Sequence, residues 1–284
     1  MTTDITITGT GVPIPAPGVA GPGVLVRHND VLMQFDVGRN TLGRLTEIDV
    51  DPQDLSAVFV SHHHSDHLVG LVDLVMTRWV MHHADHKQLT IVVPRGPSLS
   101  YVESMLDPWD DDITVRMEHV GRDDRPSPMV RAFDAPSTPT EIWAEGDVSV
   151  LAVTVHHEPV TPSVGFRIET PDGVVVISGD TRVCDEVGEL SRGASVVVHE
   201  AMRTNVMRHF FGVAPQLQQI SEYHADTVEL GAMAERVKIP HLVLTHLIPF
   251  VTTDADRQGF ADDLVAGGYT GQVTVARDLT TITI

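Results

Sequence analysis

The residues best suited to chemistry stand together in the segment SHHHSDH at positions 61–67. It follows an apolar run and contains the pattern His-x-His-x-Asp-His, formed by His62, His64, Asp66 and His67. In extended backbone, His62 and His64 point to the same side and can bind one metal ion. If a helix begins at Asp66, its carboxylate and His67 can bind a second ion beside the first. Imidazole and carboxylate ligands without a thiolate suit zinc, with manganese and iron as alternatives.

Residues that can bind metal also follow four other strand-like runs. VLAVTV leads into His156-His157-Glu158, GVVVIS into Gly179-Asp180-Thr181, ASVVV into His199-Glu200, and HLVLT into His246. The carboxyl ends of successive strands in an α/β sheet meet at one edge, which is where such folds place their sites. These strand ends and the 61–67 segment together predict a site for two divalent metal ions.

Composition limits the class of protein. The chain has 284 residues, of which 42% are hydrophobic and 20% charged, as in globular proteins. Acidic residues outnumber basic ones 39 to 19, and the net charge of −20 argues against binding nucleic acid through a basic face. The single cysteine, Cys184, excludes an internal disulfide framework and a cysteine-based zinc site. No signal-like start or membrane-length apolar run is present, so a cytoplasmic protein is expected.

Short apolar runs between glycines and prolines predict many strands, several of them covered on both faces. Strands are expected at 4–9, 24–27, 31–36, 55–60, 90–93, 148–155, 164–169, 173–178, 195–198, 241–245 and 273–284. Helices are expected at 66–82, 97–106, 184–191, 224–237 and 254–266. The acid-rich stretch 107–147 is expected to be a connector with short strands. Both halves of the chain run from strands into helices, which favours an α/β fold of two similar halves packed face to face.

The order of these motifs resembles that of the metallo-β-lactamase superfamily of metallohydrolases. The resemblance covers nearly the whole chain and includes Phe35-Asp36-Val37-Gly38, the 61–67 segment, His157, Ser178-Gly179-Asp180-Thr181 and His246. It implies one domain over residues 1–284, folded as a four-layer αββα sandwich.

The resemblance also assigns metal ligands. One ion would be bound by His62, His64 and His157, the other by Asp66, His67 and His246, with Asp180 bridging the two. The run that begins at His157 is similar to the family's third-ligand segment, so His157 is the expected ligand rather than His156. His63 is expected to point away from the ions.

Two further residues of the resemblance have supporting roles. Asp36 would orient the ligands from behind. Gly38 would be a backbone position that needs freedom in φ.

Three other motifs are similar to the ribonuclease Z and arylsulfatase-like branch of this family. They are Gly9-Thr10-Gly11-Val12-Pro13-Ile14-Pro15, His199-Glu200-Ala201 and Tyr223-His224-Ala225-Asp226-Thr227. This resemblance implies that His224 donates a proton to the leaving oxygen or stabilises developing charge, with Glu200 orienting it. The alternative is that His224 only caps the following helix. Asp66 would be both a ligand and the hydrogen-bond acceptor for the attacking water.

The expected function is metal-assisted hydrolysis. The first expectation is a phosphodiesterase of ribonuclease Z type that acts on a small phosphodiester or an RNA 3′ end. The alternative is hydrolysis of a sulfate ester, a lactone or another small ester by the same two ions. A redox di-iron role is disfavoured because oxygen-reducing relatives usually carry a glutamate in place of His64. A non-catalytic scaffold is disfavoured because the full ligand set is present.

The sequence indicates less about the substrate and the oligomeric state. His157 and Asp180 are 23 residues apart, which leaves no room for the long arm by which ribonuclease Z typically grips transfer RNA. Together with the charge of −20, this disfavours folded transfer RNA as the substrate. A homodimer is an expectation from the family alone.

Several other residues have two interpretations. The cluster His82, His83, Asp85 and His86 could bind an ion or form a polar helix end. Trp79, Met81, Phe210 and Phe211 could line the substrate cleft or pack in the ordinary way. The stretch Met207–Gln219 could form a lid.

Overall fold

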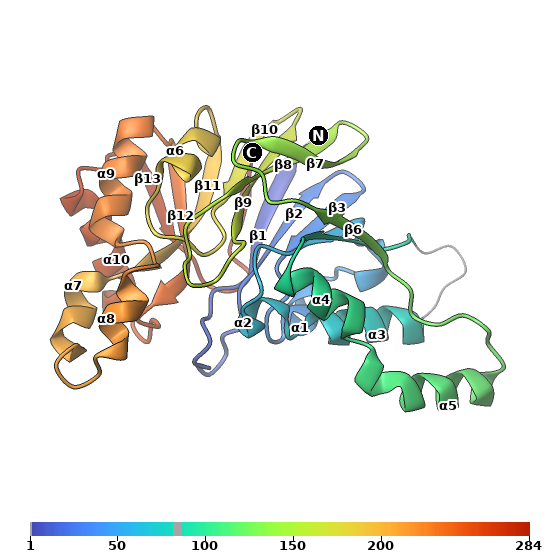
Figure 1. Ribbon diagram of the computed structural model, residues 1–284. Coiled ribbons are helices and arrows are strands. Elements are labelled where there is room, and N and C mark those ends of the chain that lie inside the picture. Colours follow the sequence, from blue (N-terminus) through green and yellow to red (C-terminus); the bar gives the residue numbers. More distant parts are fainter. Residues whose placement is uncertain (1, 82–86) are drawn as a thin grey trace.

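The strands form two seven-stranded sheets that pack face to face (Figure 1). The structure, a computed structural model, describes residues 2–81 and 87–284. The first sheet has the order β14-β1-β2-β3-β4-β5-β6 and the second the order β13-β12-β11-β10-β9-β8-β7. The strands of the first sheet are β1 (Thr3–Gly9), β2 (Gly23–His28), β3 (Val31–Phe35), β4 (Ala57–Phe59), β5 (Thr90–Pro94), β6 (Met129–Phe133) and β14 (Thr281–Thr283). Those of the second are β7 (Thr140–Glu145), β8 (Val148–Thr154), β9 (Val164–Thr170), β10 (Gly173–Ile177), β11 (Val196–Met202), β12 (His241–Ile248) and β13 (Gln272–Val275).

The two sheets repeat one topology. In the first, β14, β1, β2 and β3 are antiparallel neighbours and β3 to β6 are parallel. In the second, β7 to β10 are antiparallel and β10 to β13 are parallel. The prediction of two similar β/α halves is therefore confirmed.

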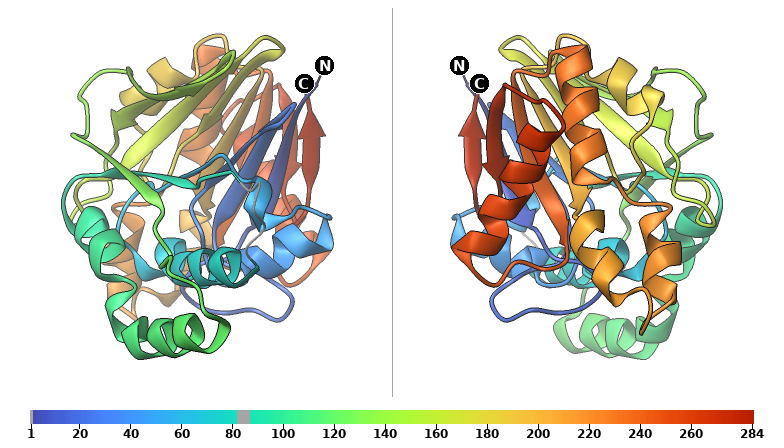
Figure 2. Two further views of the ribbon diagram at one scale, coloured as in Figure 1. Left: turned by 90° about the vertical axis from the view of Figure 1, so that its right-hand side faces the viewer. Right: turned by 90° about the vertical axis from the view of Figure 1, so that its left-hand side faces the viewer.

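Helices cover the outer faces of both sheets and complete the αββα sandwich. They are α1 (Thr41–Glu47), α2 (Ser65–Leu68), α3 (Leu71–Met81), α4 (Pro97–Ser104), α5 (Asp110–Val120), α6 (Asp185–Leu190), α7 (Thr204–Met207), α8 (Gln216–Ser221), α9 (Thr227–Val237) and α10 (Asp254–Ala266). Figure 2 shows α9 and α10, in orange and red, over the outer face of the second sheet, and the two chain ends close together. No helix in the described ranges is long and apolar enough to cross a membrane.

Aromatic rings fill the space between the sheets. Phe35 stacks on Phe59 with ring centroids 4.6 Å apart, and Phe166 and Trp143 of the opposite sheet contact this pair. All four rings are buried. This core fixes the two sheets relative to each other, so that the ends of their strands form one continuous edge.

Three expected elements differ from the structure. The helix predicted at 66–82 is divided into α2 and α3 around Gly70, where a Cβ atom would lie 2.3 Å from the Gly38 carbonyl oxygen. The strand predicted at 273–284 is divided into β13 and β14, which belong to different sheets. The connector 107–147 contains an 11-residue helix, α5, in addition to β6 and β7. Acidic residues in its first turn and Gly121 at its C-cap stabilise this helix.

Candidate metal centre

The predicted ligands come together at one edge of the sandwich. The 61–67 segment leaves β4 in extended backbone and enters α2 at Ser65, within one residue of the predicted helix start. His157 follows β8, Asp180 follows β10, and His246 stands near the end of β12. Figure 1 shows α2, α7 and α8 at this same end of the sheets.

His246 is aimed by an irregularity in β12. The pairing with β11 shifts between Thr245 and Leu247, so His246 is the unpaired residue of a β-bulge. Its φ of 44° lies in the left-handed region, which costs a non-glycine residue about 1–3 kcal/mol. Strain of this kind is characteristic of functional sites, and here it directs the imidazole toward Asp66 and Asp180.

The first group of donors is His62, His64, His157 and Asp180, whose donor atoms all lie within 4.8 Å of one another. His157 Nε2 lies 3.2 Å from His64 Nδ1. Asp180 Oδ2 lies 3.9 Å from the Nε2 atoms of both His62 and His157. Ligand atoms on a tetrahedral zinc ion with bonds of about 2.0–2.1 Å are roughly 3.3 Å apart, so this group has the size of a metal site.

The second group is Asp66, His67 and His246. Asp66 Oδ2 lies 3.7 Å from His67 Nε2 and 3.5 Å from His246 Nε2. Asp180 Oδ2 lies 3.3 Å and 3.2 Å from the same two nitrogens. The Asp180 carboxylate oxygen therefore lies within 3.9 Å of histidine nitrogens of both groups.

Unpartnered buried atoms show that cations fit this cluster. His62 Nε2, Asp66 Oδ2, His67 Nε2 and His246 Nε2 are buried and have no hydrogen-bond partner in the described part of the chain. Buried polar atoms are nearly always hydrogen-bonded, and nitrogens and oxygens that converge without partners are what metal ions require. The buried His/Asp cluster is consistent with a site for two metal ions.

Asp36 orients two of the histidines from behind. Its Oδ2 accepts hydrogen bonds from His67 Nδ1 and Ser61 Oγ, both at 2.7 Å, and its Oδ1 accepts one from the Ser61 backbone N–H at 2.8 Å. Ser61 Oγ in turn accepts a bond from His62 Nδ1 at 2.9 Å. Both imidazoles thus present Nε2 to the cluster, which is the way that hydrogen bonds behind the ligands usually orient metal-bound histidine.

Gly38 differs from its prediction. Its φ is outside the left-handed region, and the residues with positive φ between β3 and α1 are Asp36, at 53°, and Asn40, at 65°. A Cβ atom on Gly38 would lie 2.5 Å from the Gly21 carbonyl carbon and 2.6 Å from the Asp66 carbonyl oxygen. Glycine is needed here for space, because two backbone segments of the site pack directly against it.

The electrostatics of the cluster suit cation binding. Burial lowers the pKa of His62, and His67 lowers it further; burial and His157 lower the pKa of His64 to about 4. These imidazoles are neutral at neutral pH, the form that binds metal. Burial would raise the pKa of Asp180, but His246 and His67 outweigh it and hold that pKa well below its usual range.

His67 titrates in the opposite direction. Burial lowers its pKa, but the Asp180 and Asp36 carboxylates outweigh burial and raise the pKa well above the ordinary value. Without an ion, His67 is therefore protonated at neutral pH.

His224 and Glu200 form a pair beside the cluster. His224 Nδ1 donates to Glu200 Oε1 at 2.8 Å, and the same oxygen accepts a bond from the Thr181 backbone N–H at 2.9 Å. The His224 ring stacks on His246, and its donor atoms lie within 4.8 Å of those of Asp180 and His246. The alternative role of His224 as a helix cap is wrong, because the N-cap of α9 is Asp226, whose side chain accepts bonds from two backbone N–H groups.

The neighbouring histidines lie outside both groups. His156 contacts Glu158 at 3.3 Å and Glu186 at 3.2 Å, whereas the next residue, His157, donates from Nδ1 to the Tyr223 carbonyl oxygen. His199 is fully buried and its Nδ1 donates to the Glu200 carbonyl oxygen. Positions 82, 83, 85 and 86, where a second cluster was predicted, lie outside the described residues.

A cleft of about 380 Å³ opens onto the cluster. His64, Asp66, Asp180 and His246 line it together with apolar residues that the sequence did not assign to a cleft, among them Ile14 and Phe250. Met207 and Leu217, both from the predicted lid stretch, also line it. Their movement as a lid stays a prediction.

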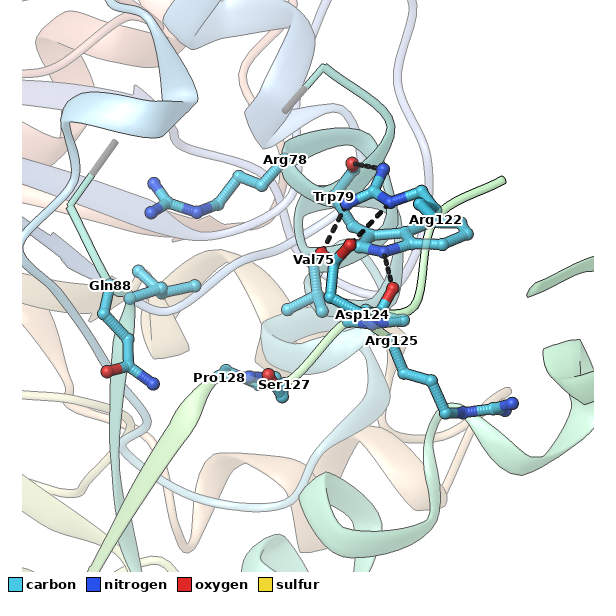
Figure 3. A pocket seen from close by; sticks show the side chains of 11 residues that line it. Val75, Arg78, Trp79, Gln88, Arg122, Asp124, Arg125, Ser127 and Pro128 are labelled. Carbon is cyan, nitrogen blue, oxygen red and sulfur yellow. Dashed lines mark hydrogen bonds and ion pairs between the residues drawn. The ribbon is translucent and has the colours of Figure 1, made fainter. Parts of the chain in front are cut away.

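The four residues suggested for the substrate cleft, three of them aromatic, lie elsewhere. In the described part of the chain, the lining of this cleft does not include Trp79, Met81, Phe210 or Phe211, so of their two interpretations the cleft-lining one is wrong. Figure 3 shows Trp79 in a separate pocket of about 200 Å³, where the guanidinium of Arg122 lies 4.6 Å from the ring centroid. Arg122 also binds the Asp124 carboxylate and the Trp79 carbonyl oxygen, so its role there is structural.

Known proteins share this fold and sequence pattern. The model of the family described as "Metallo-beta-lactamase superfamily" matches residues 18–228. A protein named ribonuclease Z from Mycobacterium bovis is 35% identical over 279 residues, which is 97% of this chain and 96% of that protein. The metallo-beta-lactamase fold protein YhfI from Bacillus subtilis has a TM-score of 0.73 at 20% identity and covers all of both chains. The short form of human tRNase Z has a TM-score of 0.67 at 21% identity over 98% of each chain. This chain therefore belongs to the metallo-beta-lactamase superfamily and, within it, to the ribonuclease Z-like proteins.

Proposed function

We propose that this protein is a two-metal phosphodiesterase of ribonuclease Z type that cleaves a small phosphodiester or an RNA 3′ end. The observation that carries the proposal is the set of buried, unpartnered ligand atoms in two groups that share Asp180. The full-length similarity to proteins named ribonuclease Z supports the reaction class.

The ligand assignment follows the two groups. One ion would be held by His62, His64 and His157, and the other by Asp66, His67 and His246, with Asp180 between them. The donor set suits zinc best, with manganese or iron as alternatives. When bound, the two ions would supply an activated water and neutralise the phosphate charge.

The protein's own side chains would then move the protons. Asp66 would accept a hydrogen bond from the attacking water, since Asp66 lines the cleft and its buried Oδ2 has no hydrogen-bond partner in the described chain. His224 would protonate the leaving oxygen. Burial lowers the pKa of His224, but the Glu200 carboxylate outweighs burial and raises it, and the hydrogen bond to Glu200 fixes the orientation of the imidazole.

The substrate must reach the cluster without a transfer-RNA-gripping arm in the interval from His157 to Asp180. Within that interval, residues 164–177 form β9, β10 and the two-residue turn between them. The net charge of −20 further disfavours a long polyanion. A homodimer and a cytoplasmic location stay predictions.

The test measures metal content and turnover together. The protein loaded with zinc or manganese is assayed on bis-(p-nitrophenyl) phosphate, p-nitrophenyl sulfate, a lactone panel and a transfer RNA precursor with a 3′ trailer. We expect hydrolysis of the phosphodiester above the sulfate and the lactones. A sulfate or lactone turned over faster than every phosphodiester would make the second ester class the function.

Adjacent histidines provide a matched control. His157→Ala should lose metal and activity, because it removes a buried donor. His156→Ala should keep both, because its partners are Glu158 and Glu186. Equal losses in both variants would contradict the ligand assignment.

A further inference from the structure

The cleft over the metal-binding groups has apolar walls from three segments that are distant in sequence. The loop between β1 and β2 contributes Ile14, helices α7 and α8 contribute Met207, Leu217 and Ile220, and the end of β12 and the residues after it contribute Ile248 and Phe250. The floor is polar and consists of ligand side chains such as Asp66, Asp180 and His246. A molecule that reaches the ions must therefore pass between apolar walls.

The mouth of this cleft exposes large apolar side chains to water. Ile14 is 65% exposed and Phe250 is 46% exposed, although both also line the cleft. Exposed apolar surface that adjoins a concave site marks a place where ligands or partners bind. This apolar surface is continuous with the metal-binding floor. A group that binds against it therefore belongs to the same molecule that reaches the floor, which is the substrate.

In the described part of the chain, the same walls lack the long basic side chains that bind a phosphate backbone. Among the described residues that line the cleft, none is Lys or Arg. Two bound divalent ions would offset the negative charge of the carboxylates in the floor. Their remaining positive charge can balance one phosphodiester group. A polynucleotide brings a further negative charge with every nucleotide, and phosphate binding of that kind depends on Lys and Arg. The cleft therefore suits one anionic group attached to an apolar body.

We propose that the substrate of this centre is a monoanionic phosphodiester whose non-leaving alcohol is a bulky alkyl or aryl group, which binds between Ile14, Phe250 and the α7–α8 wall. The inference rests on the proposed function, since it takes the phosphodiester as the group that reacts. The cleft volume of about 380 Å³ lies in the range of small-molecule sites, roughly 300–1,000 Å³.

The experiment varies the non-leaving alcohol and keeps the leaving group constant. The metal-loaded full chain is assayed on methyl, ethyl, butyl and hexyl p-nitrophenyl phosphates. In each reaction the P–O bond to p-nitrophenolate breaks, a P–O bond to the water oxygen forms, and the product is the monoalkyl phosphate. Burial of a methylene group favours binding about threefold to fourfold, so kcat/KM should rise by at least about tenfold from methyl to butyl. Thymidine 5′-p-nitrophenyl phosphate should be a poorer substrate than the butyl ester.

Variants at the mouth test whether these walls cause the preference. Ile14→Ser and Phe250→Ser should each flatten the dependence on chain length. Val265→Ser is the matched control: Val265 is 64% exposed on α10 and does not line the cleft, so its variant should keep the wild-type dependence.

A binding measurement separates this inference from the proposed function. Dimethyl and dibutyl phosphate keep the charge but lack a good leaving group, and their affinities for the metal-loaded protein are measured by isothermal titration calorimetry. Dibutyl phosphate should bind at least about tenfold more tightly. Hydrolysis of all diesters at equal kcat/KM, with equal affinities, would overturn the inference and leave the proposed function standing. Tighter binding of dibutyl phosphate without hydrolysis of any diester would overturn the proposed function and keep the apolar site.

Discussion

Asp36→Asn tests how the ligands are held without removing any ligand. The Asp36 carboxylate accepts three hydrogen bonds, from the Ser61 backbone N–H, Ser61 Oγ and His67 Nδ1. Asparagine has nearly the same shape and tolerates the φ of 53°, so the backbone turn should survive. Its amide, however, offers one acceptor and one donor group where the carboxylate offers two acceptors.

The magnitude follows from those contacts. With the amide nitrogen at the Oδ2 position, an N–H group faces both the Ser61 hydroxyl and His67 Nδ1 at 2.7 Å. One outcome is that a buried donor is left without a partner, which costs about 1–3 kcal/mol of stability. The other is that His67 carries its proton on Nε2, the nitrogen that should bind the ion. Losing such an orienting group typically lowers metal affinity 10–100-fold, which is about 1.4–2.7 kcal/mol.

Metal affinity is measured by competition with a chromogenic chelator, and bound metal by mass spectrometry. Asp49→Asn is the control, because Asp49 is exposed and also has a positive φ, of 54°. We expect a 10–100-fold weaker second ion in Asp36→Asn and wild-type affinity in Asp49→Asn. If Asp36→Asn binds both ions as tightly as the wild type, Asp36 does not orient His67 and this explanation is refuted.

Three further predictions follow from the site. His224→Ala should lower kcat by about 10²–10⁴-fold with both ions retained, whereas a parallel loss of metal would make His224 a ligand instead of a proton donor. Gly38→Ala should lower the melting temperature by several degrees, because its Cβ would meet backbone atoms at 2.5–2.7 Å; Gly212→Ala, with open space around it, should not. Metal loading at pH 7 should release about one proton, mainly from His67, whose raised pKa keeps it protonated in the metal-free protein. Calorimetry in buffers of different ionisation enthalpy counts that proton, and no dependence on the buffer would contradict the assignment.

The sequence predicted the features that depend on residue type and on spacing along the chain. The spacing of His62, His64, Asp66 and His67 after a strand indicated two adjacent ligand groups, and the structure places these side chains as two groups around Asp180. The two-half topology followed from repeated apolar runs, since buried parallel strands are nearly continuous in Val, Ile and Leu.

Features that depend on contacts between distant segments could not be predicted. Ile14 and Phe250 line one cleft but are 236 positions apart, and as apolar residues they look like ordinary core positions. The division of the last predicted strand between two sheets is likewise set by packing. Helix α5 could have been found, because Asp110, Asp111 and Asp112 at one end and Gly121 at the other are helix-boundary signals.

Anomalous diffraction from crystals of the metal-loaded protein tests the central claim most directly. We predict two anomalous peaks, one among His62, His64 and His157 and the other among Asp66, His67 and His246, both at about 2.0–2.2 Å from oxygens of Asp180. A single ion, or ions bound without Asp180, would contradict the two-metal centre.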